Sequence, residues 1–289
     1  MTSSPITGID HALVAVRDLE AARAAYVRLG FTATPRGRHT TRDTANYGLM
    51  LERGYIELIG PAGAGPSGYH PLDGFLARRE GLLGIAFASD DADAAHAALA
   101  AAGLDPSPPE DLARNLELAG GTVQPRFRLV RLPAAATPAL AAFICCHLTP
   151  ELVRQPDWLA HANGARALAG VTTVVDDPPA LAAAYATLLG AGAVTRTDDL
   201  LTVRAGAMSL VFATPGDFAR LYPDCDLGAD PGDSALPLIA AMTVTVDDIG
   251  QAAEALAANG VAHSRDGDRA LVVPADAARG AMLEFVSAG

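Results

Sequence analysis

The chain has 289 residues, half of them apolar, and a formal net charge of −12 at pH 7 in which every basic residue is arginine. This balance argues against an extended nucleic-acid or membrane-surface footprint. No apolar run approaches the ~20 residues that cross a bilayer. The three cysteines include an adjacent pair and suggest no disulfide framework, and residues 1–10 lack the features of an export signal. We therefore expect a cytoplasmic protein, and the Arg-, Ala- and Gly-rich composition is typical of a GC-rich bacterial genome.

A strand–helix unit recurs four times along the chain. In each copy a short apolar strand runs into an aspartate, and an alanine-rich helix follows that stops at a glycine. An aspartate there can cap the first helical turn, and a glycine commonly takes the left-handed conformation that ends a helix. The four passages are Gly8–Gly30, Leu82–Gly103, Gly170–Gly190 and Ile239–Gly260, with the aspartates at Asp18, Asp91, Asp177 and Asp248.

Short β-rich runs follow each helix, so that each unit reads βαβββ. In the first unit the runs are Phe31–Thr34, Ala45–Leu51 and Tyr55–Ile59, with a turn at Arg36–Gly37. Because one such unit cannot bury its sheet alone, we predict an α+β protein with four βαβββ units paired into two half-barrel modules.

The predicted boundaries are 6–150 for the N-terminal pair, 151–168 for a connection and 169–289 for a degenerate C-terminal pair. Two irregular segments interrupt the pattern. The proline-rich segment Leu104–Pro125 is interpreted as a long loop inside the second unit, and Tyr222–Pro237 as a solvated acidic linker.

Polar side chains that can bind a metal collect in the first two units. His11 lies on the first strand, where the other units have glycine or alanine, and Glu57 lies on the last strand of the same unit. Strand alternation places Tyr55, Glu57 and Ile59 on one face, and His147 shares a face with Cys145 on the last strand of the second unit. If the two units close into a half-barrel, two imidazoles and a carboxylate converge, a set that suits Zn²⁺, Fe²⁺, Mn²⁺ or Ni²⁺. The alternative is a histidine that forms hydrogen bonds within the core and a glutamate at a sheet edge.

The sequence resembles the vicinal oxygen chelate superfamily, and within it the glyoxalase-like branch. Members of this superfamily are built from βαβββ units, and many hold a divalent metal that chelates two substrate oxygens. The motifs that carry the resemblance are Gly8-Ile9-Asp10-His11, His39-Thr40, Thr44-Ala45-Asn46, Tyr55-Ile56-Glu57-Leu58, the run His147–Leu152, Pro156-Asp157-Trp158 and His161–Ala165.

The resemblance implies a metal site formed by His11 and Glu57, which match the superfamily's first-strand and last-strand ligands. The third ligand often comes from the first strand of the partner unit, but that position is Gly84, and the likeness suggests His147 instead. The implied activity is a divalent-metal-dependent isomerase or lyase acting on a small oxygenated metabolite. A metal-free protein that binds or sequesters a small molecule is the alternative. An extradiol dioxygenase is disfavoured, because the third and fourth units lack the first-strand histidine.

Further candidates lie on the same region of the chain. His39 is predicted to act as a general acid or base, and Asn46 to bind a substrate oxygen, against the alternative of an exposed hairpin. Arg38 and Arg128 are predicted to bind an anionic substrate group if they face inward, and are otherwise surface charges. Trp158 either covers the site as a lid or, as the preferred interpretation, seals the boundary between the halves. The expected partner is a small-molecule substrate, with no nucleic acid or membrane, and the sequence also allows a homodimer.

Overall fold

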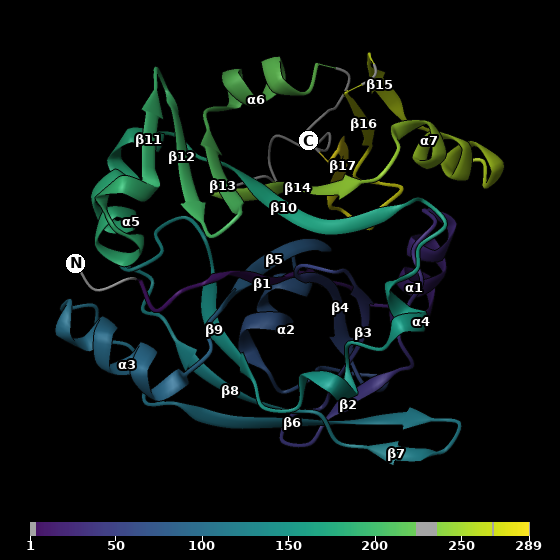
Figure 1. The fold of residues 1–289 in the computed structure, drawn as a ribbon, viewed down its shortest axis with the longest axis horizontal. Helices are drawn as coiled ribbons and strands as arrows, with labels where there is room; N and C mark the ends of the chain where they lie inside the picture. The colour runs from purple at the N-terminus through teal and green to yellow at the C-terminus, as the bar shows by residue number, and fades with distance from the viewer. Residues whose placement is uncertain (1–3, 224–235, 268, 289) are drawn as a thin grey trace.

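The computed structural model describes residues 4–223, 236–267 and 269–288. Within these residues the strands form two sheets, each built from two βαβββ units (Figure 1). The predicted fold of four units paired into two modules is therefore confirmed. Cys225 and most of the predicted acidic linker lie outside the described residues.

The N-terminal module contains the first and second units. Its strand order is β2-β3-β4-β1-β5-β9-β8-β6-β7, and an additional pairing joins β2 to β6, which closes the sheet into a barrel. Strand β1 runs parallel to β4 and antiparallel to β5, so the first strands of the two units meet at the centre. The elements are β1 (Gly8–Ala15), α1 (Leu19–Arg28), β2 (Gly37–His39), β3 (Thr44–Met50), β4 (Tyr55–Pro61), α2 (His70–Leu76), β5 (Gly81–Ala88), α3 (Ala92–Ala101), β6 (Glu110–Leu118), β7 (Gly121–Val123), β8 (Arg126–Arg131) and β9 (Ala142–His147).

The C-terminal module repeats this arrangement, with strand order β11-β12-β13-β10-β14-β17-β16-β15. Among the strands that the structure describes, no pairing joins β11 to β15, so this sheet is an open half-barrel. A connection consisting of the short helices η1 (Pro150–Leu152) and α4 (Pro156–Leu159) leads into it. Its elements are β10 (Ala165–Val174), η2 (Pro178–Leu181), α5 (Ala182–Leu189), η3 (Ala191–Ala193), β11 (Val194–Thr197), β12 (Leu200–Ala205), β13 (Met208–Ala213), α6 (Pro215–Leu221), β14 (Leu238–Val246), α7 (Ile249–Ala258), β15 (Ser264–Asp266), β16 (Ala270–Val273) and β17 (Met282–Ser287).

The helix in each unit begins and ends as the repeated pattern predicts. The side chain of the aspartate accepts a hydrogen bond from the backbone N–H of the first turn in all four units. The glycine after each helix has a φ between 64° and 93°, a conformation that a residue with a Cβ rarely adopts. The caps are Asp18, Asp91, Asp177 and Asp248, and the glycines are Gly30, Gly103, Gly190 and Gly260.

Two local predictions are wrong. Residues Phe31–Thr34 form no strand, because the Phe31 N–H still bonds to Tyr26 at the end of α1. The strand starts instead at Gly37, within the predicted turn, where it pairs with both β3 and β6. The segment Leu104–Pro125 is likewise not one long loop. β6 begins directly after Pro109 and forms a hairpin with β7.

The largest apolar cluster lies between the two modules and includes the buried faces of α1, α5 and α7. Two tyrosines cross this boundary, since the Tyr26 hydroxyl donates to the Ala278 carbonyl and the Tyr185 hydroxyl to that of Pro138. The outer faces of the two sheets therefore pack together, which leaves the concave face of each sheet pointing away from the boundary.

A short helix covers part of each concave face. In the N-terminal module α2 lies inside the ring of strands (Figure 1), and its Leu72 and Leu76 pack on Leu13, Ala15 and Ile59. In the C-terminal module α6 occupies the corresponding place, and its Phe218 belongs to an apolar cluster on that face. The barrel interior beyond α2 is lined by apolar side chains around a small group of buried polar ones, and that group forms the candidate site.

Candidate functional site

His11 lies at the centre of the barrel interior. On β1 it faces Tyr55 of β4 in register, and the two rings stack with centroids 4.5 Å apart. The ring of Phe143 on β9 packs edge-on against the other side at 5.7 Å. The histidine is only 2% exposed. Aromatic neighbours on two other strands therefore hold the imidazole in one orientation.

A β-bulge brings Asp10 to the same side of the strand as His11. Ile9 pairs with Phe87 and His11 with Ala86, so Asp10 has no partner in the ladder and the normal alternation is interrupted. Its Oδ2 accepts a hydrogen bond from His11 Nδ1 at 2.7 Å and another from His147 Nε2 at 3.1 Å. One buried carboxylate thus links the two histidines, a role that strand periodicity could not have predicted.

Glu57 completes the pair with His11. Its Oε2 lies 3.2 Å from His11 Nε2, and its Oε1 accepts a hydrogen bond from Asn46 Nδ2 at 2.5 Å. The predicted alternation on β4 is confirmed, because Tyr55, Glu57 and Ile59 all face the interior. Gly37 makes room for the amide, since a Cβ at this position would lie 2.3 Å from Asn46 Oδ1. Asn46 therefore positions the glutamate.

His39 lines the same cavity as His11 and Glu57. Its Nδ1 lies 2.7 Å from the Thr44 hydroxyl, which connects the two sides of the β2–β3 hairpin. Burial lowers the pKa of His39 to about 4, so this imidazole is neutral at physiological pH. His39 is therefore not an exposed hairpin histidine, which was the alternative interpretation.

The pKa values in this cluster reflect strong coupling. Burial alone would raise the pKa of Asp10, but the hydrogen bonds from His11 and His147 outweigh it and hold the pKa well below its usual range. Burial alone would lower the pKa of His11, but Asp10 and Glu57 raise it to about 9. The same pairing lowers the pKa of Glu57 to about 2 against the effect of burial. Without another cation, the two carboxylates therefore keep a proton on His11.

The His11–Glu57 pair has the spacing that a shared metal ion requires. Two ligand atoms about 2.1 Å from one ion and at roughly right angles to each other lie about 3 Å apart, and His11 Nε2 and Glu57 Oε2 are 3.2 Å apart. His11 Nε2 is buried and forms no hydrogen bond with any described residue. Its other nitrogen donates to Asp10, as the second nitrogen of a metal-bound histidine usually donates to a carboxylate. The residues present thus fit a divalent ion.

His147 joins this cluster through Asp10. Its Nε2 bonds to that carboxylate, and its Nδ1 is buried without a partner in the described part of the chain. Among the described residues, the one group of three donors with a ligand atom each within 4.8 Å of one another is Asp10, His11 and Cys145, and the predicted set of His11, Glu57 and His147 does not form such a group. Burial and the nearby carboxylates raise the pKa of the Cys145 thiol well above its usual value, so without a metal this side chain is a neutral thiol.

Arg114 is a residue of this cavity that the sequence interpretation missed. It lies on β6, is 2% exposed, and its guanidinium carbon is 5.5 Å from the centroid of the Phe127 ring. A signal for it existed, because Leu112, Arg114 and Leu116 alternate with more exposed polar residues along that strand. The segment was interpreted as a loop, and the alternation was therefore not used.

Two predicted substrate-binding arginines point away from the cavity. Arg38 has a side chain that is 66% exposed and pairs with Asp43 on the same hairpin. Arg128 lies on the outer face of β8 and pairs with Asp93 and Asp111. Because neighbouring strand residues face opposite sides, it is Phe127 and Leu129 that face inward. These two arginines are surface charges and do not belong to this site.

Trp158 lies on α4, in the connection that follows the N-terminal module. It packs against a cluster that contains Met50, Tyr55, Phe127 and Val153, all from the N-terminal half or the connection. The preferred interpretation, that it seals the boundary between the halves, is therefore wrong. Its predicted contact with substrate remains a prediction.

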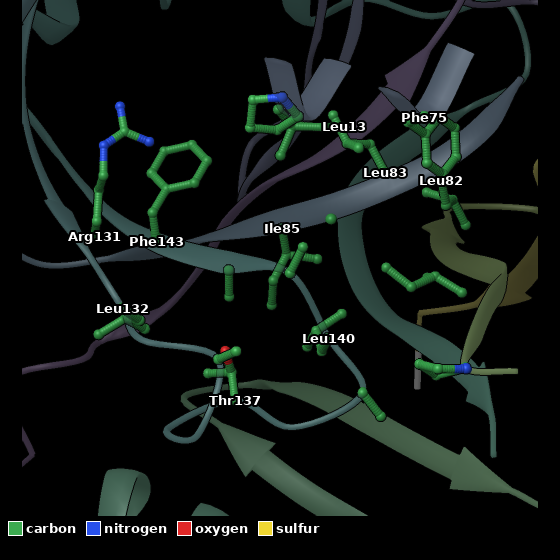
Figure 2. A pocket seen from close by; sticks show the side chains of 18 of the residues that line it. Leu13, Phe75, Leu82, Leu83, Ile85, Arg131, Leu132, Thr137, Leu140 and Phe143 are labelled. Carbon is green, nitrogen blue, oxygen red and sulfur yellow. The ribbon is translucent and has the colours of Figure 1, made fainter. Parts of the chain in front are cut away.

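The cavity between these residues measures about 50 Å³. Since one water needs about 10–15 Å³ by this measure, it has room for roughly three to five waters. A larger pocket of about 750 Å³ lies outside it, between α2, the start of β5 and the 132–142 loop (Figure 2). The two share Leu13, Tyr69 and Phe143 as a common wall. The larger pocket is mainly apolar and contains no metal donors, so the inner cavity is the candidate site.

In the described part of the C-terminal module the corresponding site is absent. Glu284 on β17 occupies the position of Glu57, but it accepts hydrogen bonds from Thr243 at 2.7 Å and Tyr222 at 3.4 Å. Gly170 and Ala241 stand where a first-strand histidine would be needed. The fourth unit pairs with the third, so Glu284 cannot reach the N-terminal cluster.

A family model described as a glyoxalase-like domain matches residues 9–189. The chain belongs to this glyoxalase-like family. The match includes β1, β4 and β9, which carry the three predicted metal ligands. No curated protein sequence matches the chain.

Solved structures resemble the whole glyoxalase-like chain. A hypothetical protein from Staphylococcus aureus has a TM-score of 0.66 at 10% identity, covering 96% of this chain and 98% of its own. A mutant of 4-hydroxymandelate synthase from Streptomyces coelicolor has a TM-score of 0.57 at 15% identity, covering 98% and 93%. A fusion of a xylose isomerase-like TIM barrel with 4-hydroxyphenylpyruvate dioxygenase has a TM-score of 0.55 at 15% identity, with coverage of 99% and 49%. At these identities the similarity establishes the fold of two glyoxalase-like modules.

Among the described helices, none is both long and apolar enough to cross a membrane.

Proposed function

We propose that the protein is a divalent-metal-dependent enzyme of the isomerase or lyase type that acts on a small oxygenated metabolite. His11, Glu57 and His147 would hold the ion. The observation that carries the proposal is the pair His11 Nε2 and Glu57 Oε2, 3.2 Å apart and buried, with Asp10 behind the histidine. The metal could be Zn²⁺, Fe²⁺, Mn²⁺ or Ni²⁺.

The chain's own residues supply the remaining parts of the chemistry. When bound, a divalent ion polarises a substrate carbonyl or hydroxyl oxygen. His39 is held neutral by burial and can take up a proton from a bound substrate, with Thr44 fixing its ring. Asn46 holds Glu57 in place. Leu13 and Phe143 form an apolar wall of the cavity, and a wall of low polarity strengthens the electrostatic interactions inside it.

The proposal is tested by metal analysis of protein prepared without chelator or affinity tag and then reconstituted. We expect one equivalent in the wild type, and its loss in His11→Asn and Glu57→Gln with the fold intact by circular dichroism. His96→Asn on α3 and the exposed Glu52→Gln are matched controls that should keep the metal. A wild type that takes up no metal, or a Glu57→Gln variant that keeps it, would contradict the proposal.

A second candidate function, metal-free binding of an apolar small molecule, is supported by the 750 Å³ outer pocket. Binding of 1-anilinonaphthalene-8-sulfonate to metal-free protein tests it. Ala134→Trp would fill the pocket and should abolish binding, whereas Ala135→Trp, on the neighbouring exposed residue, should not. If both variants bind the dye like the wild type, the pocket is not the binding site and this candidate loses its support.

A further inference from the structure

The guanidinium of Arg114 is buried over the Phe127 ring and has no ion-pair partner in the described part of the chain. Its Nε is buried without a hydrogen bond, and no ion pair joins the group to any described residue. Other arginines around the same barrel are paired, since Arg42 and Arg131 both reach Glu110, and Arg128 reaches Asp93. An arginine cannot lose its proton in a protein, and burying an unpaired charge is strongly unfavourable. The buried charge of Arg114 therefore lowers the stability of the folded protein unless a negatively charged group binds to it.

The side chain is fixed in place and directed into the candidate site. Arg114 stands opposite His39 in the β2–β6 pairing that closes the barrel. Its Cδ would lie 3.1 Å from a Cβ at Gly37, and its guanidinium lies over the Phe127 ring. It lines the same 50 Å³ cavity as His11 and Glu57.

The formal charges in the cavity call for one more negative charge when a metal is present. Asp10 and Glu57 contribute −2 and Arg114 contributes +1, Arg42 at the cavity wall is paired with Glu110, and the imidazoles are neutral when they act as ligands. A divalent ion changes this total of −1 to +1, and a monoanion brings it to zero. The cavity has room for a group of only a few heavy atoms. A carboxylate satisfies both conditions, and a guanidinium binds a carboxylate with two parallel hydrogen bonds.

We propose that Arg114 is the specificity-determining residue for a substrate that carries a single carboxylate. This inference rests on the proposed metal-dependent function and specifies its substrate class. Arg114 binds the carboxylate, which leaves an adjacent substrate oxygen for the metal side of the cavity. A neutral analogue of the same size leaves the guanidinium unpartnered and binds more weakly.

The experiment compares glycolate with its neutral isostere glycolamide, by isothermal titration calorimetry, on metal-free and Mn²⁺-loaded protein. The variants are Arg114→Met, which keeps the size without the charge, Arg114→Lys, which keeps the charge without the fork, and the exposed Arg126→Met as a control. We expect Mn²⁺-loaded wild type to prefer glycolate by roughly 10- to 100-fold, the range of a lost charged hydrogen-bonding group. Arg114→Met should remove this preference, Arg114→Lys should retain part of it, and Arg126→Met should retain all of it.

Mn²⁺ binding, titrated separately, keeps the two proposals distinguishable. If the wild type binds Mn²⁺ but shows no preference for glycolate, or if Arg114→Met keeps the preference, the inference about Arg114 is overturned while the metal site stands. If Mn²⁺ does not bind but glycolate binds through Arg114, the metal-dependent function fails and the anion site stands. If Arg114→Met fails to fold, Arg114→Lys tests the inference instead. A preference for glycolate that is unchanged in Arg114→Lys would argue against a bidentate contact with the carboxylate.

Discussion

Replacing Gly37 by alanine tests the positions of the side chains inside the barrel without changing any residue that we propose to bind the metal or the substrate. The new Cβ would lie 2.3 Å from Asn46 Oδ1, whereas ordinary contact begins at 3.4 Å, so the amide must retreat by the difference of 1.1 Å. A displacement of that size breaks the 2.5 Å hydrogen bond from Asn46 to Glu57. Gly37 does not have a positive φ, so backbone strain does not enter.

The expected loss of stability follows from these contacts. Overpacking costs about 1–3 kcal/mol, and loss of a hydrogen bond to a charged group about 1.5–3 kcal/mol. The reduced freedom of the unfolded chain offsets about 0.4–1 kcal/mol. The net loss is roughly 2–5 kcal/mol, which should lower the unfolding midpoint by at least about 4 °C. Metal affinity should also fall, because Glu57 is no longer held in place.

Differential scanning calorimetry of four variants checks this reasoning: Gly37→Ala, Asn46→Ala, the double variant and a control. Gly63→Ala is the control, because nothing lies within 4 Å of its Cβ, and it should leave the midpoint nearly unchanged. In the double variant Gly37→Ala/Asn46→Ala the amide is absent, so the two losses should not add. If Gly37→Ala is as stable as the wild type, or if the double variant shows simple additivity, Asn46 does not occupy the position described.

Other predictions concern the same cluster. Asp10→Asn should weaken metal binding by about 10- to 100-fold by releasing His11, and Cys145→Ala should leave it unchanged. In a metal titration, unchanged affinity in Asp10→Asn would show that the carboxylate does not support His11, and lost affinity in Cys145→Ala would identify the thiol as a direct ligand. The pKa of His39 is about 4 in the folded protein and 6.5 for a free histidine side chain, so between these two pH values only the unfolded chain gains the proton. Stability should therefore fall between pH 6.5 and 4 by up to about 3 kcal/mol, and urea titrations of His39→Gln should lack this component. Arg128→Gln should change neither metal content nor the unfolding midpoint appreciably, since its ion pairs are solvated; loss of metal would show that its outward position is wrong.

The fold was predictable because its signals are local. An aspartate at the end of a strand and a glycine twelve or thirteen residues later determine where a helix starts and stops, independently of what packs on it. Repetition then identified the βαβββ unit. Local signals failed where pairing partners decide the structure. Gly37 was assigned to a turn, but its strand forms because β3 and β6 both offer it hydrogen bonds.

The sequence by itself determined the repeat, the helix limits and the inward face of β4 that carries Glu57, because these depend on neighbours a few residues apart. Only the tertiary structure decided that Asp10 joins His11 to His147, because a bulge breaks the alternation from which facing is inferred. The tertiary structure also decided that Arg114 lies inside the barrel and Arg128 outside it. The pairing of β2 with β6 closes the barrel and thereby sets which face of each later strand is enclosed.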